Sequence, residues 1–408
     1  MGNFNYLKTL KIARLLLKSV LPLDIVNNII KEAGMTKTEN PSIAKHFKGI
    51  SDPRSNNKRH KLIDIITIAI CAVICNADSF AHIEEFGKAK CKWFKIFLEL
   101  PHGIPSTDTF ERLFARIDPD EFKASFIKWI QAICELTKGE IVSIDGKTLR
   151  RSHDKSNGKS TIHMVSAWAG ANGIVIGQRK TDEKSNEITA IPELLKTLEI
   201  KGCIVTIDAM GCQKNIAEKI IDKGADYVLS LKGNQGNLHD DVKLFFQEHQ
   251  KNKFKNLFFD YHETVDGGHG KIEIRRYWTT SDIGWLQGSE DWKDLGTICM
   301  VERERHFDDR VEKETSYYIG SIENNAEKFG HAVRSHWGIE NSLHWVLDVT
   351  FREDESRIRK DNAPENFAVL RHIALNMVKK ETTPKKSIKA KRLRAGWDND
   401  YLLKVLAG

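Results

Sequence analysis

The sequence predicts a mixed α/β protein in which an all-helical region precedes a core built around a sheet. Three observations lead to this prediction. Apolar residues recur at helical spacing throughout residues 52–138. After Gly139 they gather instead in short runs rich in Ile and Val, which are typical of buried strands. Beyond residue 203 these runs alternate with helical segments, and such alternation indicates parallel strands joined by helices.

The composition is typical of a folded, soluble protein. The chain has 408 residues, of which 40% are hydrophobic and 29% are charged, so it can bury a sizeable core and form two or three domains. Its seven cysteines are scattered without a CxxC pair, which predicts reduced thiols and argues against a zinc site. The longest apolar run, residues 65–75, is too short to cross a bilayer. Since no secretory signal is evident either, we expect a cytoplasmic protein without membrane contact.

The helical region divides into two parts. Residues 1–48 are predicted to form a lysine-rich helical extension that breaks near Pro41. Residues 49–138 are predicted to form a helical accessory domain, in which a break at 100–105 ends one helix and Ser106 can cap the next. Four basic residues stand at its start: Arg54, Lys58, Arg59 and Lys61. They favour positioning on duplex DNA, but a packing or dimerisation module with a basic edge is an equal alternative.

The core is predicted to span residues 139–380. Its five strands are expected at residues 141–144, 161–168, 173–178, 203–207 and 226–231. Helices expected at residues 191–198 and 215–223 separate the later strands. Three strands in a meander, followed by alternating helices and strands, form the order of a ribonuclease H-like α/β core.

A β-rich insertion is predicted within this core at about residues 236–320. Its strands are expected at residues 272–277, 297–302 and 315–319, with Asp-Gly and Asp-Asp turns nearby. A long helix is expected from about Ala326, and a second one from Pro364 to Lys380. The remaining residues, 381–408, are predicted to form a basic tail.

Positive charge is concentrated ahead of the C-terminus. Between Lys379 and Arg394 the chain has eight basic residues and one acid, a net charge of +7 that equals the formal charge of the whole protein. Such a run is typical of a solvated surface, and it also suits contact with a phosphate backbone. The candidate phosphate ligands in this run are Lys385, Lys386, Lys389, Lys391 and Arg392.

Two acids stand at the ends of predicted strands. Asp145 follows an apolar run that ends in Ile144, and Asp208 follows one that ends in Ile207. Acids in this position lie where a sheet opens to solvent, so the two carboxylates can converge at one edge. Because converging carboxylates repel each other, we expect a hard cation, Mg²⁺ or Mn²⁺, between them. The alternative for Asp145 is a hairpin turn, since Asp-Gly is a strong turn dipeptide.

A third acid, Glu340, lies in a segment rich in aromatic rings and imidazoles. His336, Glu340 and His344 recur every four residues, so they share one helix face with Trp337. This face is typical of neither a core nor a solvated surface, although Glu340 alone would be an ordinary exposed residue. Three carboxylates suit two-cation phosphoryl transfer on nucleic acid without a covalent intermediate. The chain has no GxxxxGK[ST] loop, so no nucleotide cofactor is expected.

Several motifs follow one another in an order that recurs in one protein family. They are DPR (52–54), GIPSTDTF (103–110), IDGK (144–147), KSNEITAIP (184–192), TIDAMGCQ (206–213), LKGNQ (231–235), HGKIE (269–273) and RSHWGIEN (334–341). By these motifs the sequence resembles insertion-sequence transposases of the DDE superfamily, in the ISAs-type branch that includes the H-repeat-associated proteins linked to Rhs elements. The resemblance extends from residue 52 almost to the C-terminus.

The resemblance implies an enzyme that binds the terminal inverted repeats of its own element and catalyses DNA cleavage and strand transfer. It implies Asp145, Asp208 and Glu340 as ligands of Mg²⁺ or Mn²⁺. The partners implied are double-stranded DNA of the element ends and the target, and a second copy of the chain in a homodimer on DNA, at the nucleoid. A DNA-binding relative without catalysis and a nuclease without strand transfer are the alternatives.

One departure from the wider superfamily concerns the residues around the last acid. Val333, His336 and Leu347 stand where many relatives have Tyr, Arg and Lys, and Arg334 is the candidate replacement for the Arg. The DNA-binding candidates around the core are Lys147, Lys232, Arg334, His336 and Trp337.

Overall fold

The computed structural model describes residues 43–407, except 56–57, 154–159, 182–186, 256, 269–270 and 383–384. Nearly all of the predicted N-terminal extension, residues 1–48, therefore lies outside the described residues. Within the described part, no helix is both long and apolar enough to cross a membrane.

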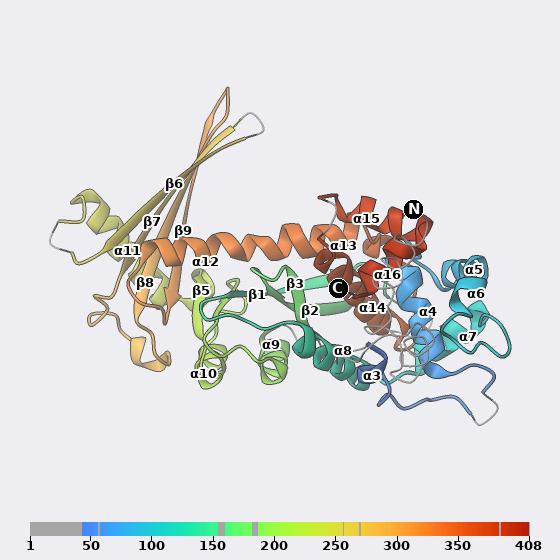
Figure 1. The fold of residues 1–408 in the computed structure, drawn as a ribbon. Coiled ribbons are helices and arrows are strands. Elements are labelled where there is room, and N and C mark those ends of the chain that lie inside the picture. The colour runs from blue at the N-terminus through green and yellow to red at the C-terminus, as the bar shows by residue number, and fades with distance from the viewer. Residues whose placement is uncertain are drawn as a thin grey trace, which may run out of the picture.

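The strands of the described chain form one nine-stranded sheet, in the order β3-β2-β1-β4-β5-β9-β8-β7-β6 (Figure 1). The core strands are β1 (Ile141–Leu149), β2 (Ile162–Ala169), β3 (Ile174–Lys180), β4 (Ile204–Ile207) and β5 (Asp226–Leu231). β1 pairs antiparallel with β2 and parallel with β4, while β2 and β3 are antiparallel and β4 and β5 are parallel. This is the arrangement of a ribonuclease H-like core, so the predicted fold class is confirmed.

The β-rich insertion extends this sheet instead of forming a separate one. Its strands are β6 (Asp260–Gly268), β7 (Lys271–Thr280), β8 (Thr297–His306) and β9 (Val311–Gly320), and each is antiparallel to the next. β9 pairs with β5, and Figure 1 shows the strands of the insertion projecting from the core as a long twisted ribbon. Helix α11 (Asn237–Lys251) precedes them. The sequence did not predict β6, because its residues are mostly polar and exposed.

Helices cover both faces of the core sheet. α12 (Ala326–Ile339) crosses one face, where it contacts β1 and β4. α9 (Glu187–Thr197) and α10 (Lys214–Asp222) lie on the other face (Figure 1). Successive side chains of β1 point alternately to the two faces of the sheet. Ser143 Oγ lies 3.5 Å from the Ser335 carbonyl oxygen in α12, whereas Gly146 faces the first residue of α9.

The helical domain draws on both ends of the chain. Its N-terminal helices are α3 (Ile43–Phe47), α4 (Leu62–Ile74), α5 (Phe80–Ala89), α6 (Cys91–Phe94), α7 (Thr107–Arg116) and α8 (Pro119–Ile133). α14 (Ala363–Lys380) packs against α4, α7 and α8, and also against β3. Asn376 of α14 exchanges two hydrogen bonds, of 2.9 and 2.8 Å, with the backbone of Val175 in β3. The predicted accessory domain, residues 49–138, therefore shares its core with C-terminal helices.

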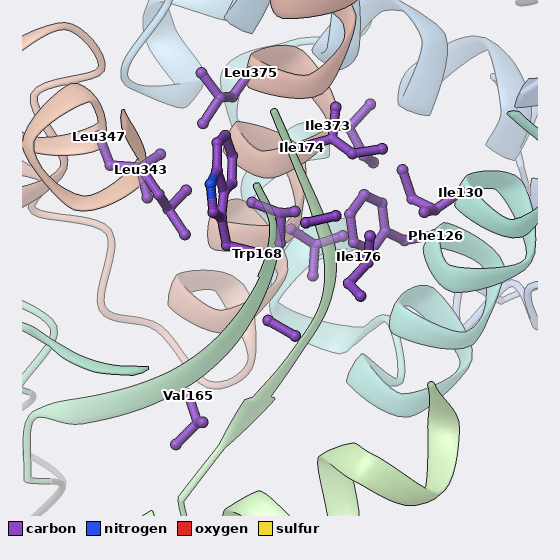
Figure 2. Packing of buried hydrophobic residues seen from close by; sticks show 14 of the residues in the cluster. Phe126, Ile130, Val165, Trp168, Ile174, Ile176, Leu343, Leu347, Ile373 and Leu375 are labelled. Carbon is purple, nitrogen blue, oxygen red and sulfur yellow. The ribbon is translucent and has the colours of Figure 1, made fainter. Parts of the chain in front are cut away.

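Figure 2 shows part of this shared core around Trp168 of β2, whose side chain is buried. Leu375 of α14 lies on one side of the indole, and Leu343 and Leu347 lie on another. Burying one such side chain contributes about 1.5–3 kcal/mol. The apolar side chains that follow Glu340 thus anchor that segment to the same core as the C-terminal helix.

Residues 385–407 continue this packing as helices α15 (Ile388–Trp397) and α16 (Asn399–Ala407), which lie against α14. Arg392 is 2% exposed, and its guanidinium donates hydrogen bonds to the carbonyl oxygens of Val73 and Ile74 at the end of α4. It also lies 3.7 Å from the ring centroid of Phe351. Arg392 thus supplies donors to carbonyl groups at the end of α4, where the helix itself no longer provides its regular backbone partners.

Lys391 is buried as well, and its ammonium group donates to the carbonyl oxygens of Val378 and Glu381. The prediction that Lys391 and Arg392 contact phosphate is therefore wrong, because both cations are used inside the protein. Three other predicted phosphate ligands are exposed: Lys385, Lys386 and Lys389.

Replacing Arg392 by Met should lower the free energy of unfolding by about 2–4 kcal/mol, because several buried carbonyl oxygens lose their donors. Denaturant titration would measure the change. Lys389→Met, in the same helix but exposed, serves as the control and should change the free energy by no more than about 0.5 kcal/mol. Equal stability of the two variants would contradict the structural role of Arg392.

Candidate metal-dependent active site

The pairing of β1 with β4 places two acids side by side. Ile144 pairs with Ile207 in parallel register, so Asp145 and Asp208 follow at the same level of the sheet. Asp145 lies within β1, opposite Ser166 of β2, and the alternative of a hairpin turn at this position is therefore wrong. The Asp208 Oδ1 atom accepts the backbone N–H groups of the second and third residues after it, at 3.1 and 3.2 Å, which fixes its carboxylate.

Glu340 reaches the same place from the end of α12. There the helix changes into a π-helical turn, Glu340–His344, and such turns occur frequently at functional sites. His344 Nδ1 lies 3.4 Å from Asp145 Oδ2 and 3.9 Å from Glu340 Oε2. His336 does not reach the acids, because its Nδ1 lies 2.9 Å from Thr206 Oγ1, beneath α12.

The sequence reasoning missed a fourth carboxylate, that of Glu187 at the start of α9. Its Oε1 lies 2.7 Å from His163 Nε2 in β2. Gly146 makes room for it, because a Cβ there would lie 2.1 Å from Glu187 Oε1 and 2.4 Å from His163 Nε2. The signal was present, since Glu187 is the one acid in the KSNEITAIP motif.

These side chains form two groups that fit a divalent cation. In one, the ligand atoms of Asp145, Glu340 and His344 lie within 4.8 Å of one another. The second group consists of Asp145, Glu187 and Asp208, whose ligand atoms also lie within 4.8 Å of one another. Carboxylate oxygens suit Mg²⁺ and Mn²⁺, and a neutral imidazole suits Mn²⁺ and later transition metals.

Burial and the nearness of several carboxylates determine the protonation of the site. Burial raises the pKa of Asp145 to about 8, and the nearby Glu340 charge adds to this effect. Burial also raises the pKa of Asp208, which the Lys232 charge opposes. Burial lowers the pKa of His344 to about 4, so its imidazole is neutral at pH 7. A bound cation would relieve the repulsion and favour the ionised carboxylates.

Lys147 lies two residues beyond Asp145 in β1, and its charge is used inside the protein. Its Nζ donates to Glu353 Oε2 at 2.7 Å and to the carboxylate of Asp348, and its side chain is only 12% exposed. Lys147 was predicted to contact DNA. The structure instead makes it a link between β1 and the segment after the π-helical turn.

Lys232 stands at the same sheet edge as the acids, directly after β5, and is exposed. The loop that follows is tied to the loop of Asp208. Asn234 Nδ2 donates to the Ala209 carbonyl oxygen at 2.8 Å, and Gln235 Nε2 donates to that of Cys212 at 2.6 Å. These bonds give the LKGNQ motif a structural role beside the site.

Arg334 and Trp337 are exposed on α12 and line a groove between this helix and the insertion. Arg303 of β8 lies 5.1 Å from the centroid of the Trp337 ring, and Arg334 lies 3.2 Å from Asp266. The groove continues to Asn341 and Ser342, next to Glu340. Two residues at the positions of departure, Val333 and Leu347, are buried and belong to the core.

Two family models match the chain. Residues 136–377 match the one described as Transposase DDE domain, and residues 44–130 match the one described as DDE_Tnp_1-associated. The chain belongs to the DDE transposase family. The resemblance inferred from the motifs is thus confirmed.

Relatives in this transposase family align over most of the chain. "Putative transposase YncI" of Escherichia coli O157:H7 is 44% identical over 371 residues, which cover 90% of this chain and 94% of that protein. "H repeat-associated putative transposase YhhI" of Escherichia coli strain K12 is 41% identical over 373 residues, 90% of this chain and 98% of that one. The cryo-EM structure of a piggyBac transposase synaptic complex with hairpin DNA gives a TM-score of 0.38 at 11% identity, over 86% of this chain and 74% of that chain.

Gly146→Ala should reduce Mn²⁺ affinity about tenfold, because the new Cβ displaces the carboxylate of Glu187. The cost in stability should be small, since the clashing atoms are the ends of side chains that can move. Isothermal titration with Mn²⁺ and thermal unfolding would measure both effects. Gly267→Ala is the matched control, because this glycine also lies in a strand but has nothing within 4 Å of the added Cβ. Unchanged Mn²⁺ affinity in Gly146→Ala would contradict the assignment of Glu187 as a ligand of the cation.

Proposed function

We propose that this protein is a DNA transposase that binds the ends of its insertion sequence and catalyses metal-dependent cleavage and strand transfer. One observation carries the proposal. In a chain of the DDE family, strand register sets Asp145 beside Asp208, and α12 returns Glu340 to the same point. The proposed assembly on DNA is a homodimer, with one copy for each element end.

The chain's own residues hold the reacting groups in place. Bound Mg²⁺ or Mn²⁺ would activate the attacking oxygen and stabilise the leaving oxygen, which is the chemistry of two-cation phosphoryl transfer. Asp145 is fixed by the strand ladder and Asp208 by two backbone N–H groups. The Lys147–Glu353 bond holds the segment after Glu340 against β1.

A basic pocket in the helical domain supports contact with duplex DNA. Its cationic and imidazole-bearing lining residues are Arg54, Lys58, Arg59, His60, His102, Arg112 and Arg116. No carboxylate is among the residues that line this pocket in the described structure. Arg54 is held by two bonds to Asp52, of 2.9 and 2.8 Å, while Arg59 and Arg116 are exposed. Exposed arginines around a cavity lined with hydroxyl groups suit phosphate oxygens.

Further contacts are proposed nearer the acids. Lys232 is suited to the phosphate at the reacting strand, and Arg334 and Trp337 to DNA that follows the groove beside α12. The exposed lysines ahead of and within α15, which are Lys385, Lys386 and Lys389, are the remaining candidates.

Asp208→Asn should abolish cleavage while binding to the element ends stays within about twofold, because the change removes charge at the cation without changing shape. Cleavage and strand transfer would be measured on DNA that carries the inverted repeats flanking the gene, and binding by gel shift. Asp240→Asn, at an exposed acid of α11, is the control and should stay active. Cleavage by Asp208→Asn at the wild-type rate in Mg²⁺ would reject the assignment. Cleavage without joining by the unaltered protein would instead indicate a nuclease.

Replacing Arg59, Arg112 and Arg116 together by Gln should weaken binding to all DNA sequences alike. Each lost phosphate contact should make the negative slope of log affinity against log salt less steep by about 0.9. Fluorescence anisotropy at several salt concentrations would give the slope. A second triple variant, with Gln at Lys385, Lys386 and Lys389, tests the other basic segment separately. An unchanged slope in the arginine variant would mean that this pocket does not contact DNA.

A further inference from the structure

Resting on the proposed function, we propose that His344 and Glu187 act as additional cation ligands, so that the two groups sharing Asp145 differ in the chemistry of their donors. Glu340 and His344 complete the first position, which contains an imidazole nitrogen and therefore selects Mn²⁺ over Mg²⁺. Glu187 and Asp208 complete the second, whose donors are all carboxylate oxygens. Within each group the three ligand atoms lie within 4.8 Å of one another.

His344 has no other use in the described part of the molecule. It is 7% exposed, and its Nε2 is buried without a hydrogen-bond partner. Its Nδ1 points between two carboxylates, at 3.4 and 3.9 Å, too far from either for a good hydrogen bond. A buried imidazole that makes no hydrogen bond is costly, and such a group requires a functional explanation. Coordination of a cation between the three side chains supplies one.

The π-helical turn is what brings His344 to this place. Glu340 and His344 are its first and last residues, and the i→i+5 turn directs both toward Asp145. Leu343 and Leu347 are buried in the core on either side of His344, so the imidazole cannot turn out to solvent without losing that packing. The first position is thus built into the helix.

A hydrogen-bonding partner, His163, orients the carboxylate of Glu187, as is common for residues that bind a metal. His163 Nε2 contacts one carboxylate oxygen at 2.7 Å, and His163 Nδ1 lies 2.9 Å from Thr148 Oγ1. Such outer contacts orient the residues that bind a metal, and they tune its affinity. Gly146 leaves the space through which Glu187 reaches Asp145.

The two donor sets differ in selectivity. Oxygen donors bind Mg²⁺ and Mn²⁺ alike, whereas an imidazole donor favours Mn²⁺, which is softer and stands in the series of transition metals. The position with His344 should therefore fill first with Mn²⁺ and discriminate strongly against Mg²⁺. The position with Glu187 should accept either ion.

Pulsed electron paramagnetic resonance of the full-length protein with Mn²⁺ tests these ligands directly, independently of catalysis. Bound Mn²⁺ should show coupling to a ¹⁴N nucleus, and His344→Gln should remove this coupling and weaken the tighter Mn²⁺ site about 10–100-fold. Glu187→Gln should keep the ¹⁴N coupling and lose one equivalent of bound Mn²⁺. Asp145→Asn should weaken both sites. His331→Gln, an exposed residue of the same helix, is the control and should leave the spectrum unchanged.

The result that overturns the first position is ¹⁴N coupling that persists in His344→Gln. An unchanged Mn²⁺ stoichiometry in Glu187→Gln overturns the second. Competition with Mg²⁺ completes the test, since equal displacement from both sites would reject the difference in selectivity. Failure of the proposed function is distinguishable, because a protein without cleavage or strand transfer would still show the predicted couplings.

Discussion

The burial of α14 determines how the two halves of the chain are joined. All residues of this helix from Ala363 to Val378 are buried, between the N-terminal helices on one side and β3 on the other. A helix from the end of the chain thus completes the core of a domain that begins before the sheet. Because the segment carrying Glu340 leads into α14 and packs on Trp168, the same burial fixes where that carboxylate lies relative to β1. Positioning of the site and stability of the helical domain are therefore coupled.

Two charged residues on one face of β1, Lys147 and Asp145, have opposite surroundings. The ammonium group of Lys147 is neutralised inside the protein by Glu353 and Asp348, and these ion pairs join β1 to the segment after the π-helical turn. Two residues earlier, the ligand groups around Asp145 in the described residues consist of other carboxylates and a neutral imidazole, and burial raises the pKa of Asp145 to about 8. Burial makes the charged form of a carboxylate unfavourable, so a cation bound here would stabilise the ionised site.

The insertion is continuous with the core sheet. β9 pairs with β5, so the strands that carry the groove arginines continue the sheet whose edge holds the acids. α12 spans both regions, with Arg334 and Trp337 over the insertion and the π-helical turn at its far end. DNA bound in the groove would consequently be held at a set distance from the carboxylates, as accurate positioning of a reacting phosphate requires.

Local pattern was sufficient for the five core strands, for the helices α12 and α14, and for the two acids Asp145 and Asp208, although β1 continues past Asp145 to Leu149. β-branched runs predicted the five core strands, and an acid directly after such a run identified Asp145 and Asp208, because these signals reside in adjacent residues. Tertiary structure alone decided that Glu187 and His344 join them, since that depends on strand register, on the space at a glycine and on a π-helical turn that helical periodicity does not reveal. It also decided the fate of the basic segment. Neighbouring residues in the sequence do not indicate that Arg392 is buried. Its guanidinium is buried because it binds the carbonyl groups at the end of α4, which the tertiary structure brings to it.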